Sequence, residues 1–338
     1  MMLKRTYLII LISLFSFGCS DFLDVEPVEE VSISEQFSTL EGTLQALNGL
    51  YFQTEALLSG NSFLYADVLG GNIAFAPSIV NRRINIPIAF DGIYNFQATP
   101  RESTFNSAYE DAYKAINSAN LILQYINNVP DASEEDKAQI RSEALAARGL
   151  LHFTILQLFA QHYGFSADAN HLGIVYNTRV LQAGVDYPAR LTVAECYRLI
   201  VQDFTEASNL FTNENALPGP GYSYFNKTSV KALLARTYLY AENWQQALNM
   251  ANEVIAASGI ALVAQENYIS EWTKPTEAMA EAILEFTAPF DVEDQVATST
   301  VAQFYRYVNP QSYGVYTASS DLLQLYGDQD IRSSQLLL

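Results

Sequence analysis

The strongest chemical signal in the sequence surrounds Cys19. Two basic residues lie near the start, the segment 7–17 is almost entirely apolar, and Gly18 stands directly before the cysteine. A short basic region followed by an apolar run too short to span a bilayer is typical of a secretory signal peptide. A small residue before a cysteine is what the lipoprotein-processing peptidase requires once the thiol carries a diacylglycerol. The sequence therefore predicts a signal peptide over residues 1–18 and a lipid on Cys19.

An ordinary signal peptide with an incidental cysteine is the alternative, because Ser16 stands where an aliphatic residue is usual. No later segment is apolar enough to cross a membrane, so we expect acyl chains on Cys19 to provide the anchor. In the mature chain Cys196 is then the only other cysteine, which excludes an internal disulfide. We interpret Cys196 as a small buried hydrophobe, with a reactive thiol as the alternative.

The three histidines do not form a recognisable metal or catalytic motif. His152, His162 and His171 lack the spacing of metal ligands. The sequence contains neither a Gly-x-Ser-x-Gly elbow nor a glycine-rich phosphate loop. We therefore expect no enzyme activity, cofactor or metal, and a structural or partly exposed position for His152. A glycosidase-like pair of carboxylates stays open as an alternative, since acidic residues are common along the chain.

Composition narrows the class of protein. The chain has 338 residues, of which 49% are hydrophobic, enough for one large domain or two smaller ones with a true core. It carries 37 acidic and 18 basic residues, and its net charge of −19 would repel a phosphate backbone. We therefore expect no nucleic-acid partner.

Two stretches lack helical periodicity and mix aromatic rings with amide and guanidinium groups. Sugars are held by flat apolar ring faces and planar hydrogen-bonding groups, so residues 60–104 and 286–338 together predict a discontinuous binding region. Irregular packing segments are the alternative. The candidate binding residues are Tyr65, Asn72, Phe75, Arg82, Arg83, Tyr94, Asn95 and Phe96 in the first stretch, and Tyr305, Tyr307, Tyr313 and Tyr316 in the second.

The elements that must carry these stretches are helices. Apolar residues recur at spacings of three and four over most of residues 35–60 and 105–285. The alanines among them allow helices to approach one another closely. Three patterns predict capping boxes at helix starts, which are Ser38 with Glu41, Ser133 with Asp136, and Thr192 with Glu195.

The most diagnostic pattern is a helical pair near residues 228–258. Its apolar positions fall at the offsets of a tetratricopeptide repeat, with Asn243 and Trp244 at the turn and Gly259 at the end. Earlier segments pair similarly, but their connectors are too long for a regular array. The sequence therefore predicts an all-α scaffold of repeat-like pairs carrying irregular loops, with an ordinary helical bundle as the alternative.

Several short motifs, taken in order behind the cysteine, resemble the SusD/RagB family of surface lipoproteins. They are Cys-Ser-Asp-Phe-Leu-Asp at 19–24, Leu-Asn-Gly-Leu-Tyr at 47–51, Ala-Tyr-Lys-Ala-Ile-Asn-Ser-Ala-Asn at 112–120, Glu-Ala-Leu-Ala-Ala-Arg at 143–148, Ala-Leu-Leu-Ala-Arg-Thr-Tyr-Leu-Tyr at 232–240 and Asp-Ile-Arg at 330–332. The resemblance implies one SusD-like domain over residues 19–338, with an all-helical core and ligand loops outside it.

The resemblance also implies a function. Such proteins sit in the outer membrane, lipid-anchored and facing outward, and pass a nutrient, most often a glycan, to a SusC-like TonB-dependent barrel. Family members generally continue well past the segment matching 330–332, so we expect the C-terminal part of the family fold to be missing here. A helical interaction scaffold without glycan binding and a peptide-binding member of the family are the alternatives.

The anchor prediction depends on a single sulfur atom. Cys19→Ala removes the acylation site without touching the helical core, so the variant should fold but lose fatty-acid labelling and leave the membrane fraction. Metabolic labelling with a radioactive fatty acid, followed by membrane sedimentation, checks this. A variant that still labels and still sediments with membranes would refute the lipoprotein interpretation.

Overall fold

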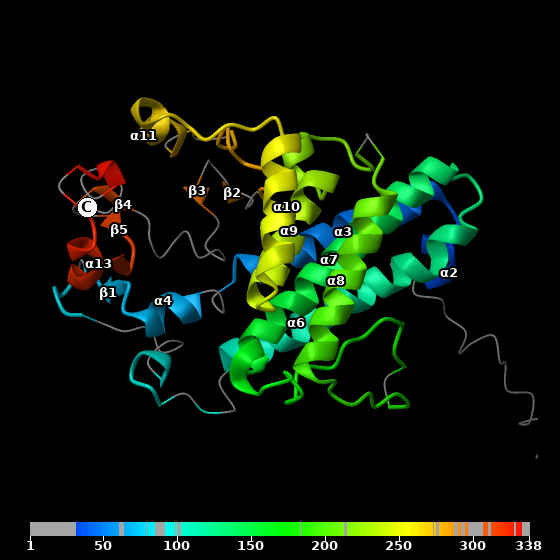
Figure 1. Cartoon of the computed structure of the whole chain (residues 1–338), viewed down its shortest axis with the longest axis horizontal. Coiled ribbons are helices and arrows are strands. Elements are labelled where there is room, and N and C mark those ends of the chain that lie inside the picture. The colour runs from blue at the N-terminus through cyan, green and yellow to red at the C-terminus, as the bar shows by residue number, and fades with distance from the viewer. Residues whose placement is uncertain are drawn as a thin grey trace, which may run out of the picture.

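The long helices pack around one central helix, α7 (Glu134–Phe159), as Figure 1 shows. The computed structural model describes residues 32–332 except 61–63, 79, 85–91, 98, 100–102, 183, 213–214, 273, 275–276, 287–289, 292–294, 297–306, 310–311 and 328. The side chains of residues 103–104 and 290–313 are likewise outside the description. Cys19 and Tyr305 therefore lie outside the described residues.

Helix α7 is buried on nearly every face over its middle. Its neighbours are α3 (Leu40–Leu58), α6 (Ser103–Tyr125), α8 (Val193–Leu210) and α9 (Lys227–Tyr240). A helix surrounded in this way needs apolar or small residues all round, and the run of alanine and leucine in α7 supplies them. At Gly149 a β-carbon would lie 2.9 Å from the ring of Phe204, so glycine lets α8 approach closely.

Two of the three predicted capping boxes are confirmed, and one is wrong by a residue. The Ser133 and Thr192 hydroxyls each accept a hydrogen bond from the backbone amide three residues on, and the Asp136 and Glu195 carboxylates accept in return from the Ser133 and Thr192 amides. The N-cap of α3 is Thr39, not Ser38. The short helix α2 (Ile33–Gln36) lies just before it, and the Ser38 hydroxyl donates to a carbonyl of that helix instead.

The last helical pair has the predicted form. Helix α9 packs against α10 (Trp244–Ala257), whose N-cap Asn243 accepts from the Gln246 amide at 3.3 Å. Gly259, with φ of +65°, follows the end of α10, where a left-handed residue commonly terminates a helix. The all-α prediction with repeat-like pairs is confirmed by these helices.

A smaller lobe at one end of the bundle joins the two irregular stretches (Figure 1). Strand β1 (Ile73–Phe75) pairs antiparallel with β6 (Tyr316–Ala318), although more than 200 residues separate them along the chain. Around this pair lie α4 (Tyr65–Gly70) and α13 (Ser320–Gln324). The lobe has a core of its own, formed by Leu64, Val68, Ile73, Phe75, Ile93 and Tyr316.

The remaining elements are short. They are the two-stranded pairs β2 (Phe290–Asp291) with β3 (Gln295–Val296) and β4 (Tyr307–Asn309) with β5 (Ser312–Tyr313), helix α11 (Tyr268–Trp272), and the 3₁₀ turns η3 (Ile126–Asn128), η4 (Tyr163–Phe165), η5 (Gly221–Ser223) and η6 (Gln265–Asn267). No helix within the described residues combines the length and apolar character that crossing a bilayer requires.

The helix pair can be tested at Ala247. This residue is buried on α10, the helix that packs against α9, so a leucine there must displace neighbouring side chains. Ala247→Leu should lower the free energy of unfolding by about 1–3 kcal/mol. The adjacent Gln246 is exposed, and Gln246→Leu should leave stability nearly unchanged. Urea unfolding of both variants checks this, and equal losses at the two positions would count against the pairing.

Candidate functional site

Two of the predicted binding rings belong to the core of the small lobe. Phe75 on β1 and Tyr316 on β6 are opposite each other in the strand pair, with ring centroids 5.3 Å apart. Each residue is only 5% exposed. A ring buried to this extent cannot offer a face to a sugar, because burying its apolar area against neighbouring side chains is what stabilises the lobe. The prediction for Phe75 and Tyr316 is therefore corrected to a packing role.

Other predicted rings lie nearer the surface of the lobe. Tyr94 is 40% exposed and packs edge-on against Phe75, at 4.9 Å between centroids. Phe96, two residues on, is 79% exposed. Tyr65 is half-buried, and its ring contacts Phe105 edge-on at 5.1 Å. Tyr94 and Phe96 are thus the predicted rings with most surface free for a ligand among those the structure describes.

Phe96 stands on strained backbone. Its φ is +56°, a left-handed conformation that a bulky side chain rarely adopts. A tight turn holds it there, because the Phe96 amide donates to the Ile93 carbonyl at 3.1 Å and the Gln97 amide donates to the Gly92 carbonyl at 2.6 Å. Such strain costs about 1–3 kcal/mol and is concentrated at binding and catalytic sites.

Arg82 shows the same combination in a neighbouring part of the sequence. Its φ is +57°, and its side chain is exposed, as is that of Arg83. The segment folds back on itself, since the Ser78 amide donates to the Arg83 carbonyl at 2.7 Å and the Arg82 amide donates to the Ser78 carbonyl at 2.8 Å. Arg82 and Arg83 in this turn, and Tyr94 and Phe96 in the turn at 92–97, are the exposed candidates of two separate turns, and we call the four residues together the lobe surface.

The positions of the remaining predicted binding residues say less about a binding role. Asn72 is exposed, and its carbonyl accepts a hydrogen bond from the Ser319 amide at 3.0 Å. Asn95 is exposed and lies between Tyr94 and Phe96 in the sequence. Tyr307 on β4 and Tyr313 on β5 are opposite each other in register. A binding role for these residues, and for Tyr305, stays a prediction.

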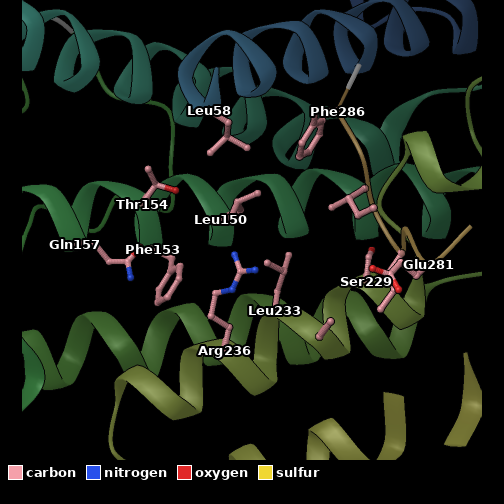
Figure 2. A pocket seen from close by; sticks show the side chains of 13 residues that line it. Leu58, Leu150, Phe153, Thr154, Gln157, Ser229, Leu233, Arg236, Glu281 and Phe286 are labelled. Carbon is pink, nitrogen blue, oxygen red and sulfur yellow. The ribbon is translucent and has the colours of Figure 1, made fainter. Parts of the chain in front are cut away.

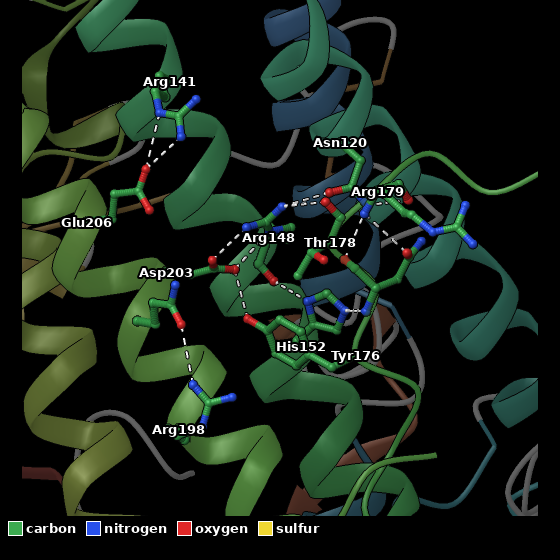
Figure 3. A network of polar contacts seen from close by, with 12 residues as sticks. Asn120, Arg141, Arg148, His152, Tyr176, Thr178, Arg179, Arg198, Asp203 and Glu206 are labelled. Carbon is green, nitrogen blue, oxygen red and sulfur yellow. Dashed lines mark hydrogen bonds and ion pairs between the residues drawn. The ribbon is translucent and has the colours of Figure 1, made fainter. Parts of the chain in front are cut away.

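A buried polar network ties the helical core together (Figure 3). Arg148 on α7 donates to both carboxylate oxygens of Asp203 on α8, at 2.8 and 2.7 Å, and to the amide oxygen of Asn120 on α6 at 2.8 Å. The Tyr176 hydroxyl also donates to the Asp203 carboxylate, at 2.7 Å. All four residues are buried. Removing one member of such a pair leaves an unmatched charge and costs about 3–5 kcal/mol, so the network acts as a structural clamp.

His152 belongs to this clamp rather than to a catalytic centre. Its Nε2 lies 3.0 Å from the Asn177 backbone amide, which can only donate, so Nε2 accepts and the proton sits on Nδ1. Nδ1 then donates to the Arg148 carbonyl at 2.9 Å, and the ring stacks on Tyr176 at 3.8 Å (Figure 3). Burial, helped by the nearby Arg148, lowers the pKa of His152 to about 3. The imidazole is therefore neutral at physiological pH and has a structural role.

A second buried carboxylate is also satisfied. Glu143 accepts from the Tyr51 hydroxyl at 2.7 Å and from the Gln139 amide at 2.7 Å. The Tyr51 oxygen in turn accepts from the Phe225 amide at 2.9 Å. Burial raises the pKa of Glu143, and burial together with Glu143 raises that of Tyr51. Asn120, Glu143 and Arg148 were named from the sequence only as members of motifs. Asp203 was missed, and the available signal for it was a carboxylate on an apolar helix face.

A cavity of about 440 Å³ opens between α3, α7, α9 and the segment 281–286. Figure 2 shows Leu58, Leu150 and Phe153 around it, with the Arg236 side chain directed between Phe153 and Leu233. Its wall is mainly apolar, so it suits packing or an apolar group better than a sugar. Across the described part of the chain, no three His, Cys, Asp or Glu residues are grouped to hold a metal ion.

Residues 21–239, well over half of the chain, match the model of a family described as "SusD-like: starch-binding associating with outer membrane". The chain belongs to the SusD-like family. The predicted resemblance is thereby confirmed, and so is the general class, a sugar-binding family associated with the outer membrane.

Individual relatives are distant in sequence, and the solved structures among them are similar in fold. The SusD-like protein P25 of Formosa agariphila is 23% identical over 87% of this chain. A SusD superfamily protein from Bacteroides thetaiotaomicron has a TM-score of 0.71 at 23% identity over 87% of this chain, and a laminarin-binding SusD-like protein has 0.68 at 20% over 87%. The chain spans only 53% of the first of these relatives and 63% and 65% of the two solved structures.

The clamp makes stability depend on pH through His152. Its pKa is about 3 in the folded protein against 6.5 when exposed, so the unfolded chain takes up a proton that the folded one does not. This contribution is complete above pH 6.5 and is lost as the pH falls from 6.5 toward 3. Between pH 6.5 and 5 the parent should lose about 1–2 kcal/mol more stability than His152→Gln.

Urea unfolding at pH 6.5 and pH 5.0 measures the difference, and the comparison cancels carboxylates common to both proteins. The matched control is His162→Gln, because His162 is exposed and should keep the parent's pH dependence. The same pH dependence in His152→Gln as in the parent would show that this imidazole is not held neutral.

Proposed function

We propose that this chain binds an oligosaccharide or polysaccharide through the lobe surface. The observation that carries the proposal is Phe96, whose ring is 79% exposed although its backbone is strained. A fold does not gain stability from holding an apolar ring in water on strained backbone. The arrangement has a physical reason if a ligand covers the ring, which fits a family described as starch-binding.

The chemistry of the lobe surface suits a sugar. The apolar face of a pyranose ring can stack on Phe96 or Tyr94, and the Arg82 and Arg83 guanidiniums can donate paired hydrogen bonds to hydroxyl oxygens. The proposal needs no reacting group. We accordingly propose a binding protein rather than an enzyme, for which incubation with a glycan should release no product.

We further propose that the chain works at the cell surface. Acylated Cys19 would hold it on the outer membrane facing outward, where it would pass its ligand to a SusC-like TonB-dependent barrel. An exposed apolar stripe on α10 supports a protein partner. Trp244, Leu248 and Ile255 share one face of that helix and are 62%, 55% and 75% exposed. The same stripe is the observation that favours the alternative, an interaction scaffold without a glycan ligand.

Truncating a ring of the lobe surface should weaken glycan binding. A desolvated aromatic contact is worth about 1–3 kcal/mol, so Phe96→Ala and Tyr94→Ala should each raise the dissociation constant roughly tenfold or more. Isothermal calorimetry with laminarin, starch and other soluble glycans measures the affinities, after thermal melting has confirmed that each variant folds.

The matched control is Tyr187→Ala, because Tyr187 is 83% exposed but lies outside the small lobe. It should bind like the parent. If every folded variant binds as well as the parent, the glycan site is elsewhere. If the parent binds short peptides and no glycan, the peptide-binding alternative replaces the proposal, and if it binds neither, the scaffold alternative does.

A further inference from the structure

A second hollow lies on the helical bundle, away from the lobe surface. It measures about 410 Å³ and opens between α3, the loop 218–224 and Phe286. Helix α3 contributes Asn48, Phe52 and Glu55, which are spaced by four and three residues and so share one face of the helix. The loop and Phe286, which are far apart in the sequence, form the opposite wall.

Glu55 is the unusual feature of this hollow. The residue is only 9% exposed, and its Oε1 atom is buried without a hydrogen-bond partner among the described residues. The other two buried carboxylates already described are satisfied, Asp203 by Arg148 and Tyr176 and Glu143 by three donors. Leaving a buried acceptor unsatisfied costs about 1–3 kcal/mol, and more for a charged group.

Aromatic residues line the same hollow as Glu55. Phe52 is 65% exposed at the rim, and Tyr224 and Phe286 stand in the opposite wall. Tyr51, beneath them, contacts Tyr224 edge-on at 5.3 Å and Phe286 at 6.3 Å. The Tyr224 hydroxyl donates to the Pro218 carbonyl at 2.8 Å, which fixes its ring. The wall is therefore held in place by contacts within the protein.

The backbone of the loop allows it to pack closely against the Tyr224 ring. Gly219 has a φ of +150°, and a β-carbon there would lie 3.0 Å from the Tyr224 ring. Glycine thus permits both the backbone conformation and the close approach of the loop to the ring. A larger residue at this position would push the ring away from the hollow.

Among the described residues that line the hollow there is no lysine, arginine or histidine. This part of the wall thus supplies no positive charge to balance Glu55. A carboxylate beside several aromatic faces is the arrangement that holds an ammonium group, which gains both an ion pair and cation–π attraction.

We propose that this hollow binds the ammonium group of an amine-bearing ligand, with Glu55 as its acceptor and Phe52, Tyr224 and Phe286 as its aromatic wall. This site is separate from the lobe surface and does not depend on the function proposed there. An amino sugar and a lysine-containing peptide offer the same chemistry, and the experiment separates them.

Calorimetry on the whole chain tests the proposal with two pairs of probes. The first pair is a glucosamine trimer and its fully N-acetylated form, and the second is Gly-Lys-Gly with blocked ends and the same peptide with acetylated lysine. At least one amine probe should bind, and its acetylated partner should bind at least tenfold more weakly, because acetylation removes the charge. Whichever amine binds identifies the source of the ligand.

Substitutions locate the binding. Glu55→Gln keeps the shape but removes the charge, and should weaken amine binding at least tenfold, while Phe52→Ala should weaken it several-fold. The matched control is Glu41→Gln, an exposed carboxylate on the same helix, which should bind like the parent. Thermal melting confirms that each variant folds.

Three results would overturn the proposal. One is that neither amine probe binds at millimolar concentration. Another is that acetylated and free amines bind equally, which would mean that charge plays no part. The third is that a folded Glu55→Gln variant binds the amine as tightly as the parent, which would place the ammonium group somewhere else.

Discussion

The structure depends on the pairing of two buried charges, Arg148 and Asp203. Each carboxylate oxygen of Asp203 accepts from the guanidinium, and Asn120 and Tyr176 satisfy the remaining capacity, so α6, α7, α8 and the loop near residue 176 are fixed to one another. Apolar packing alone would tolerate small slips between these helices, but a fully satisfied buried ion pair tolerates none, since a slip leaves a charge unmatched. His152 extends the same constraint by joining α7 to the backbone of Asn177.

Left-handed residues other than glycine occur in the lobe and also outside it, at Ala169 and Glu242. The lobe is closed by only three residue pairs between β1 and β6, and its own core is small. Within the lobe, Arg82 and Phe96 occupy left-handed conformations that cost free energy, and both side chains are exposed. The bundle contains the larger buried core, and the lobe presents the exposed rings and guanidiniums that we propose for glycan binding. The same bundle also presents Glu55 toward a ring-lined hollow, so binding chemistry is not confined to the lobe.

Local signals in the sequence predicted local structure well. The boxes at Ser133 and Thr192, and the turn at Asn243, depend on residues three apart, which the sequence displays directly. The capping box predicted at Ser38 is wrong because the Ser38 hydroxyl donates to a carbonyl of α2, one turn earlier. The candidate site was harder to predict, since Phe75 and Tyr316 become core only through a pairing between distant strands. Asp203 and Glu55 were missed for the same reason, because their importance arises from which partners the fold supplies or withholds.

Under the proposed function, a glycan covers the lobe rather than the helical bundle. Hydrogen–deuterium exchange of the whole chain, with and without saturating amounts of the glycan that binds tightest, tests it most directly. We expect slower exchange in the segments around residues 77–84 and 92–97, where backbone amides form the turns that present Arg82 and Phe96. Exchange in α7 and α8 should not change. Protection confined to the bundle, with none in these two turns, would contradict the account.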